Sequence, residues 1–178
     1  YFRDKEDVLF ELHRAGFERL RAALRAVDAE QLAPRQRLLR IGEEYIRFEY
    51  QCSAHHVNSP LYPAIRQLEF AAGFSSQDTP EEKLPKLEAL LEQSSSTSGA
   101  ALMAALLSIP AGVRYAPLNM TPQEQKHETL RALVGMLEGL ATRRPVLFVL
   151  EDAHWLDPTT QELMDLVVDR VSGSRGLV

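Results

Sequence analysis

The stretch VLFVLEDAHWLDPTT, residues 146–160, decides how the chain is expected to fold. Its first five residues, Val146 to Leu150, are apolar without alternation, which predicts a strand buried on both faces, as in a parallel sheet. The strand leads directly into two acids, Glu151 and Asp152. Because ligands of open α/β sheets bind beyond the carboxyl ends of the strands, these two carboxylates mark a candidate site.

A helix is predicted on each side of this strand. The preceding helix begins at the capping-box sequence TPQE, residues 121–124, and ends at Arg143 and Arg144, where cations suit the helix dipole. The following helix begins at residues 157–158, and apolar residues at helical spacing form its inward face: Leu163, Leu166, Val167 and Val171. Residues 176–178 could begin another strand. Helix, buried strand, helix and strand make an α/β unit.

Further helices and one short strand are predicted upstream. EYQCS, residues 49–53, could be a strand, and a helix after it, ending near Gly73, carries three apolar residues: Ile65, Leu68 and Phe70. TPEE, residues 79–82, is a second capping box. SSSTSG, residues 94–99, predicts a mobile surface loop, and ALMAALLSI, residues 101–109, a short apolar helix ended by proline.

Two amphipathic helices are predicted at the start of the chain. The first covers residues 4–28, with Asp4 as its cap. The second follows a break at Pro34, and its apolar positions have helical spacing: Leu38, Ile41, Tyr45 and Phe48. A short connection between the two helices predicts an antiparallel helical hairpin.

Composition limits the classes of function. The 178 residues carry a net charge of −5, so the charge gives no support to nucleic-acid binding, and we do not expect this chain to bind DNA. One cysteine, no signal peptide and no apolar run of membrane-spanning length predict a reducing, cytoplasmic protein without membrane association. The first residue is not Met and the last lies in an apolar run, so we expect a fragment.

The acid pair has two interpretations. Hydrolysis of a nucleoside triphosphate needs one carboxylate that holds Mg²⁺ and a second that polarises the attacking water. The alternative is that the acids only form turns and cap helices, which is the simplest interpretation of Asp157. Cys52, His55 and His56 could suggest a metal, but no fourth ligand is nearby, so Cys52 is interpreted as a small buried residue of the strand.

A family resemblance favours the first interpretation. PVLFVLEDAHWLDPTTQELMDLVVDRV, residues 145–171, resembles the Walker B region of AAA-like, STAND-type ATPase modules, those associated with class III adenylate/guanylate cyclases and large bacterial transcriptional regulators. The likeness covers about residues 49–178. It includes three further stretches: YQCSAHHVNSPLYPAIRQLEFAAGF, PEEKLPKLEALL and RYAPLNMTPQEQKHETLRALVGMLEGLATRRPVLFVLEDAHW.

The resemblance implies ATP and Mg²⁺ as cofactors and assigns roles to four residues. Glu151 takes the position of the Mg²⁺-side acid and Asp152 the water-activating position, while His154 and Trp155 could contact the nucleotide. Alternatively, His154 and Trp155 pack the turn between strand and helix. Many P-loop ATPases carry Asp and then Glu here, so the shorter second acid of this chain predicts less efficient hydrolysis.

The phosphate-binding loop of such ATPases is missing from the sequence. None of the nine glycines is followed by Lys, and no G-x-x-x-x-G-K-[ST] motif occurs. That loop supplies the backbone N–H groups and the lysine that neutralise the phosphates. We therefore expect no turnover by this chain and weak nucleotide binding at best.

The first 48 residues resemble a different family. YFRDKEDVLFELHRAGFERLRAALRAV and RLLRIGEEYIRF are similar to the start of the regulatory domain of TetR-type transcriptional regulators, whose DNA-reading helix-turn-helix would precede Tyr1. The alternative is an unrelated helical hairpin. By the resemblance, the segment could dimerise or pair with a partner domain and bind a small apolar ligand. A natural fusion, a gene remnant and an assembly artefact would all explain the junction.

Together these observations predict a mixed α/β, mostly helical chain. A TetR-like helical hairpin, residues 1–48, is followed by an incomplete P-loop-type α/β core with a small, open-edged parallel sheet, residues 49–178. The expected function is that of a fragment of an ATP-binding regulatory module in signalling, ATPase-derived but without turnover. The first alternative is a TetR-type regulator fragment that acts through dimerisation or ligand binding, and the second is a non-catalytic interaction segment.

Overall fold

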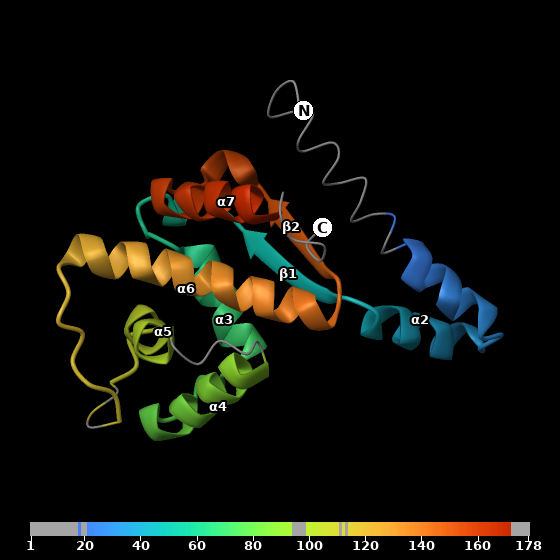
Figure 1. The fold of residues 1–178 in the computed structure, drawn as a ribbon, viewed down its shortest axis with the longest axis horizontal. Coiled ribbons are helices and arrows are strands. Elements are labelled where there is room, and N and C mark those ends of the chain that lie inside the picture. The colour runs from blue at the N-terminus through green and yellow to red at the C-terminus, as the bar shows by residue number, and fades with distance from the viewer. Residues whose placement is uncertain (1–17, 19–20, 94–98, 111, 113, 172–178) are drawn as a thin grey trace.

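The computed structural model describes residues 18, 21–93, 99–110, 112 and 114–171. The described chain is mostly helical with a two-stranded parallel sheet, which confirms the expected class (Figure 1). Its helices and strands are, in chain order, α2 Pro34–Glu43, β1 Ile46–Gln51, α3 Tyr62–Ala71, α4 Pro80–Gln93, α5 Ala100–Leu106, α6 Pro122–Arg143, β2 Val146–Glu151 and α7 Pro158–Val171. Two short 3-10 helices, η1 Ala54–His56 and η3 Ala153–Trp155, follow the two strands.

The sheet brings together segments 100 residues apart. β1 and β2 pair in parallel, with Ile46 opposite Val146 and Gln51 opposite Glu151, which confirms the expected pairing of these two segments. However, the helix predicted through Phe48 is wrong, because α2 ends at Glu43 and β1 begins at Ile46. The predicted boundary between residues 48 and 49 therefore falls within β1. Residues 46–48 are extended because they form ladder hydrogen bonds with β2, and these tertiary contacts outweigh the helical spacing of the apolar residues.

The strand β2 is less buried than its sequence suggested. Val146 is buried, but Leu147, Phe148, Val149 and Leu150 are only half-buried, so the prediction of burial on both faces is wrong. The reason is the size of the sheet, since β1 is the one described strand that flanks β2. A strand at an edge keeps part of its backbone and side chains accessible.

The hydrophobic core is built around α6. This helix contributes seven buried apolar side chains: Leu130, Leu133, Val134, Met136, Leu137, Leu140 and Ala141. Helices α4 and α5 pack on one side of it and α7 on another, while α3 packs on β1 (Figure 1). The approach of α5 is close, because a Cβ on Gly99 would lie 2.9 Å from the Cβ of Ala132 in α6.

Both predicted capping boxes are present. Before α6, the Thr121 side chain accepts the backbone N–H of Glu124, and the Glu124 carboxylate accepts the N–H of Thr121 at 2.8 Å. Before α4, Thr79 and Glu82 make the same reciprocal pair. Each box satisfies two backbone donors that a helix start leaves without partners, which explains why the predictions of these two helix starts were correct.

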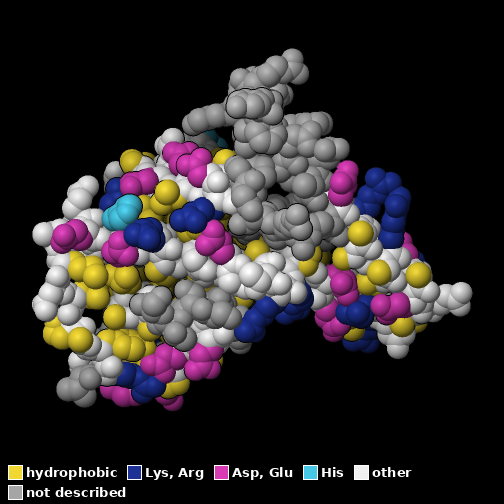
Figure 2. All heavy atoms as spheres, in the orientation of Figure 1, with side chains coloured by type: hydrophobic (Ala, Val, Ile, Leu, Met, Phe, Trp, Pro, Cys, Tyr) yellow, Lys and Arg dark blue, Asp and Glu magenta, His cyan; other side chains and the backbone are white. Residues whose placement is uncertain are grey.

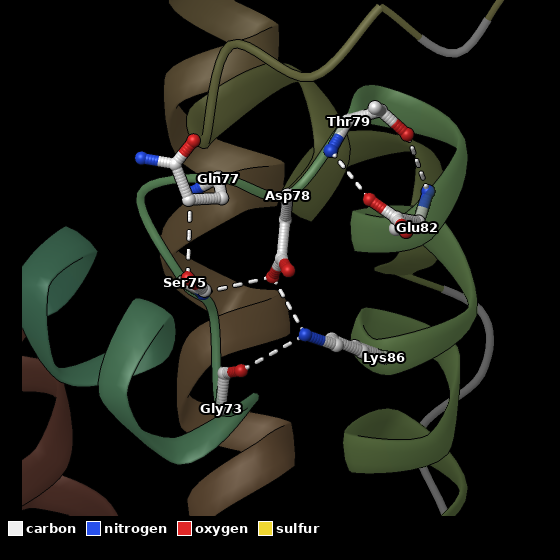
Figure 3. A network of polar contacts seen from close by, with 7 residues as sticks. All are labelled: Gly73, Ser75, Gln77, Asp78, Thr79, Glu82 and Lys86. Atoms are coloured by element: carbon white, nitrogen blue, oxygen red, sulfur yellow. Dashed lines mark hydrogen bonds and ion pairs between the residues drawn. The ribbon is translucent and has the colours of Figure 1, made fainter.

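A polar network fixes the connection between α3 and α4 (Figure 3). The Lys86 ammonium on α4 donates to the carbonyl of Gly73 at 3.2 Å and to the Asp78 carboxylate at 2.6 Å. The same carboxylate accepts the backbone N–H of Ser75 at 2.8 Å. On the preceding helix, Phe70 lies within α3 as predicted, but its side chain is 82% exposed.

The described N-terminal part is a helical hairpin. Residues 21–29 are helical, Gln31 has a positive φ of 49°, and α2 then runs back along the first helix (Figure 1). Ion pairs Arg37–Asp28 at 3.4 Å and Arg40–Glu30 at 3.6 Å join the two helices. The expected hairpin is thus present in these residues, whereas the predicted helix over residues 4–17 and the strand over 176–178 lie outside the described residues.

Candidate functional site

The two strands end side by side at the candidate site. The backbone N–H of Cys52, just after β1, donates to the carbonyl of Glu151 at 3.1 Å, and Gln51 lies opposite Glu151. The parallel pairing therefore places the loop after β1 next to the Glu151–Asp152 pair. This is the end of a sheet at which α/β proteins hold their ligands.

The two carboxylates lie at the surface of the described chain. Glu151 is the last residue of β2, and Asp152 adopts a left-handed conformation, with φ 54° and ψ 41°. Among non-glycine residues, Asp and Asn tolerate this conformation best, which suits the sharp turn into η3. Both residues are exposed. Within the described part of the chain, neither carboxylate has a hydrogen-bond or ion-pair partner.

His154 and Trp155 lie in the short helix η3 directly after the acids. Their rings are neighbours, with centroids 4.8 Å apart at an interplanar angle of 48°. Both side chains are exposed, and 42% of the surface of Trp155 is accessible to solvent. Neither packs into the core, and both lie in the turn between β2 and α7.

Asp157 has a different role from the two acids before it. It is 3% exposed, and its carboxylate accepts the backbone N–H groups of Thr159 and Thr160 at 3.0 Å, the Thr160 hydroxyl, and the N–H of Leu61 at 3.4 Å. The predicted cap of α7 is confirmed. Because its oxygens are occupied by these donors, Asp157 is not available to hold a ligand.

Cys52 is buried beside the acids. Its side chain is 4% exposed, and the pKa of its thiol is raised, first by burial and then by the negative charges of Asp157 and Asp152. The raised pKa keeps the thiol protonated and poorly nucleophilic. Cys52 is thus the small buried residue that was predicted, but it lies immediately after β1 rather than within it.

The two histidines after Cys52 do not join it. The His56 ring stacks on Tyr62 with centroids 3.5 Å apart, and His55 is exposed. Across the residues that the structure describes, no group of three or more His, Cys, Asp and Glu side chains is arranged to hold a metal ion. Mg²⁺ keeps several waters and is commonly held by only one or two carboxylates, so its binding would not require such a group.

The backbone at this end of the sheet offers little to a phosphate group. Helix N-termini bind phosphate through their unpaired N–H groups. At the start of α7, the N–H groups of Thr159 and Thr160 are bonded to Asp157, and Pro158 has none. Just before α3, the N–H of Leu61 is bonded to the same carboxylate. These residues therefore fit a hydrated cation better than a triphosphate.

Three grooves on the described surface lie away from the acids. A groove of about 520 Å³ lies at the start of α6 beside Glu162 of α7, and one of about 570 Å³ runs between β1 and α3. A third, of about 540 Å³, is lined by Ala100, Ala101 and residues 114–120, and Figure 2 shows apolar side chains at the surface in this region, over α5 and the start of α6. The acids instead project from an open sheet end.

Sequence reasoning missed one part of the site. The left-handed residue Leu61, with φ 59°, turns the chain into α3 and directs its N–H to Asp157. The nearby prolines Pro60 and Pro63 indicate a turn, but no sequence signal favours a positive φ at a leucine. The contact could be seen only once the fold was known.

Comparisons with known proteins give little further guidance. No family model matches the chain, and no solved structure matches it. An uncharacterized protein of Rhizobium meliloti (strain 1021) is 28% identical over 116 residues. The match covers 65% of this chain and 11% of that protein, so the chain spans about a tenth of the length of the curated relative that it matches. None of the described helices combines the length and apolar character that a bilayer crossing requires.

Proposed function

We propose that this chain is part of a nucleotide-responsive module of the AAA-like, STAND type, with an incomplete P-loop-type core from about residue 49 onward. One observation carries the proposal. A parallel strand ends directly in Glu151 and Asp152, and both carboxylates are exposed and unpaired among the described residues, at the sheet end where such proteins hold Mg²⁺ and nucleotide. The cap at Asp157 supports it, because that acid is occupied and leaves the other two for the ligand.

The residues present could perform part of nucleotide binding. Glu151 would hold a hydrated Mg²⁺, Asp152 would face its waters, and Trp155 would lie close enough to contact a bound nucleotide. Mg²⁺ would supply the positive charge that offsets the phosphates. No lysine-bearing phosphate loop occurs in the sequence, and the nearby helix N-termini are already bonded. We therefore expect weak, Mg²⁺-dependent binding without turnover by this chain alone.

The single tryptophan makes the proposal directly testable. Trp155 lies three residues after Asp152, so its fluorescence should change when ATP binds at the acids. We expect a saturable change at millimolar ATP with Mg²⁺ and none with ATP plus a chelator. The variant Glu151→Gln should remove the Mg²⁺ dependence, whereas Asp165→Asn, an exposed acid on α7, should not.

Two results would contradict the proposal. Binding that ignores both Mg²⁺ and Glu151→Gln would place the nucleotide elsewhere. ATP hydrolysis by the chain that disappears in Asp152→Asn would overturn the expected lack of turnover. A fluorescent ATP analogue titrated against the Trp155→Phe variant gives an independent measure of affinity that does not depend on the tryptophan.

A further inference from the structure

Gln51 is the side chain of β1 that lies next to Glu151. The two residues are opposite each other in the parallel register, and adjacent strands of a sheet are about 4.8 Å apart. The rings of Tyr50 and Phe148, with centroids 4.6 Å apart, meet on the core face of the sheet. Because side chains alternate along a strand, Gln51 and Glu151 share the opposite face, where both are exposed.

The other polar side chains on this face near the end of β1 already have partners. Glu49 forms an ion pair with Arg47 at 2.8 Å, and the Ser53 hydroxyl accepts the backbone N–H of His55 at 3.3 Å. Gln51 lies between them in the sequence, and its side chain makes no hydrogen bond with any residue that the structure describes. Its amide is therefore the group that β1 can offer to the acid on the neighbouring strand.

A glutamine amide suits a carboxylate that holds a cation. It carries two N–H donors and one carbonyl acceptor, and it has no charge that would repel Mg²⁺. A carboxylate has two oxygens, so one can face the ion while the other accepts a hydrogen bond. Partners of this kind orient metal-binding carboxylates, and their removal commonly lowers metal affinity by about 10-fold to 100-fold. The position of Gln51 beside Glu151 matches this arrangement.

We propose that Gln51 is a positioning residue for Glu151, and that its side-chain N–H donates to the Glu151 carboxylate when that carboxylate binds Mg²⁺. This role rests on the Mg²⁺ site of the proposed function, and it extends that site from the end of β2 to the end of β1. The parallel pairing holds the two strand ends in register. The orientation of Glu151 therefore depends on a residue that lies 100 positions earlier in the chain.

A titration of the full chain with MgCl₂ alone, at constant ionic strength and without nucleotide, tests this role. Trp155 fluorescence and calorimetry follow binding, and Gln51→Ala should raise the dissociation constant for Mg²⁺ by about tenfold. The same variant should keep the denaturant midpoint of the wild type, because the side chain is exposed. Gln123→Ala, which changes an exposed glutamine on α6, is the matched control and should alter neither quantity. Equal Mg²⁺ affinity of wild type and Gln51→Ala would overturn the role of Gln51 alone, whereas a wild type that does not bind Mg²⁺ would overturn the proposed site as well.

The variant Glu151→Gln separates positioning from other roles of Gln51. If Gln51 acts through Glu151, Gln51→Ala should cause no further loss of the residual Mg²⁺ affinity that Asp152 provides in Glu151→Gln. A direct ligand of the ion, or a residue that only supports the fold, would lower the affinity by the same factor in both backgrounds, and that result would contradict the proposal. The NMR signals of the Gln51 side-chain amide give a second measurement. They should shift when Mg²⁺ is added to the wild type and stay in place in Glu151→Gln, and equal shifts in both proteins would also count against the role.

Discussion

The carboxylate of Asp157, the residue before α7, accepts the backbone N–H of Leu61, which lies 96 residues earlier in the chain, at 3.4 Å. Leu61 is the residue before α3, so one buried side chain joins the starts of two helices. The same carboxylate caps α7 through the N–H groups of Thr159 and Thr160. This contact fixes the two loops that follow β1 and β2, and therefore the frame around Glu151 and Asp152.

The first prediction concerns this cap. Asp157→Ala should lower the free energy of unfolding by about 2–3 kcal/mol, because it removes a charged acceptor and leaves buried N–H groups without partners. Denaturant unfolding followed by circular dichroism measures the effect. Asp165→Ala, an exposed acid on the same helix, should be close to neutral. Equal stability of the two variants would show that Asp157 contributes nothing beyond its charge.

The sequence predicted those elements whose signals are local. The capping boxes at Thr79 and Thr121 marked two helix starts, and the apolar run before Glu151 marked β2. These predictions succeeded because the residues that form each contact lie within four positions of one another. The candidate acids were identifiable for the same reason, since they directly follow the strand.

The features that sequence reasoning missed depend on distant parts of the chain. Phe48 has helical spacing with its neighbours, yet it lies in β1 because β2, 100 residues away, offers a ladder partner. Phe70 is an apolar residue of α3 but is exposed, because α3 packs on β1 with a different face, on which Ala64, Gln67 and Leu68 are buried. Periodicity shows that a helix has an apolar face, but not which residues its neighbours cover.

Acid should weaken one link between α4 and the segment after α5. Glu88 on α4 accepts hydrogen bonds from Nε and Nη2 of Arg114 and from the Tyr115 hydroxyl, and these, the arginine first, lower the pKa of its carboxyl. A lowered folded-state pKa gives stability that is present above the ordinary glutamate value of about 4.3 and is lost as pH falls through the lowered pKa.

The variant Glu88→Gln tests this link. It should be less stable than the wild type at neutral pH, and the difference should shrink as pH falls below about 4. Thermal unfolding at a series of pH values measures the difference. Glu92→Gln, an exposed glutamate one turn further along α4, is the control and should show no such dependence. A constant difference across the pH range would mean that packing, and not ionisation, is responsible.

High pH should weaken the same link between α4 and the segment after α5, because the Tyr115 hydroxyl that donates to Glu88 then loses its proton. Burial, and then the hydrogen bond to Glu88 at 2.6 Å, raise the pKa of Tyr115 to about 12. A raised pKa gives stability that is present below the ordinary tyrosine value of about 10 and is lost as pH rises through the folded-state value. Tyrosinate absorbance can be followed against pH in the wild type and in Tyr115→Phe, and the difference between the two curves reports Tyr115. In the folded protein this difference should appear near pH 12. A component that titrates near 10 would show that Tyr115 is not held by Glu88.

The contact between α5 and α6 allows a final prediction, in which two glycine substitutions have opposite effects. A Cβ on Gly99 would lie 2.9 Å from the Cβ of Ala132, closer than two methyl groups can approach, and Gly99 is buried. Gly99→Ala should therefore destabilise the fold by about 1–3 kcal/mol. Gly42→Ala is the control, because nothing lies within 4 Å of a Cβ there. It replaces a helical glycine of α2 and should stabilise by about 0.5–1 kcal/mol.

The methyl group that opposes Gly99 provides the decisive comparison. Ala132→Gly removes the atom that a new side chain at residue 99 would meet, although it also weakens α6 by introducing a glycine. The double variant should therefore lose less stability than the sum of the two single variants, as expected of residues in direct contact. Additive losses would mean that α5 moves away from α6 to accommodate the methyl group, and that the close approach at Gly99 is not needed for the packing of these two helices.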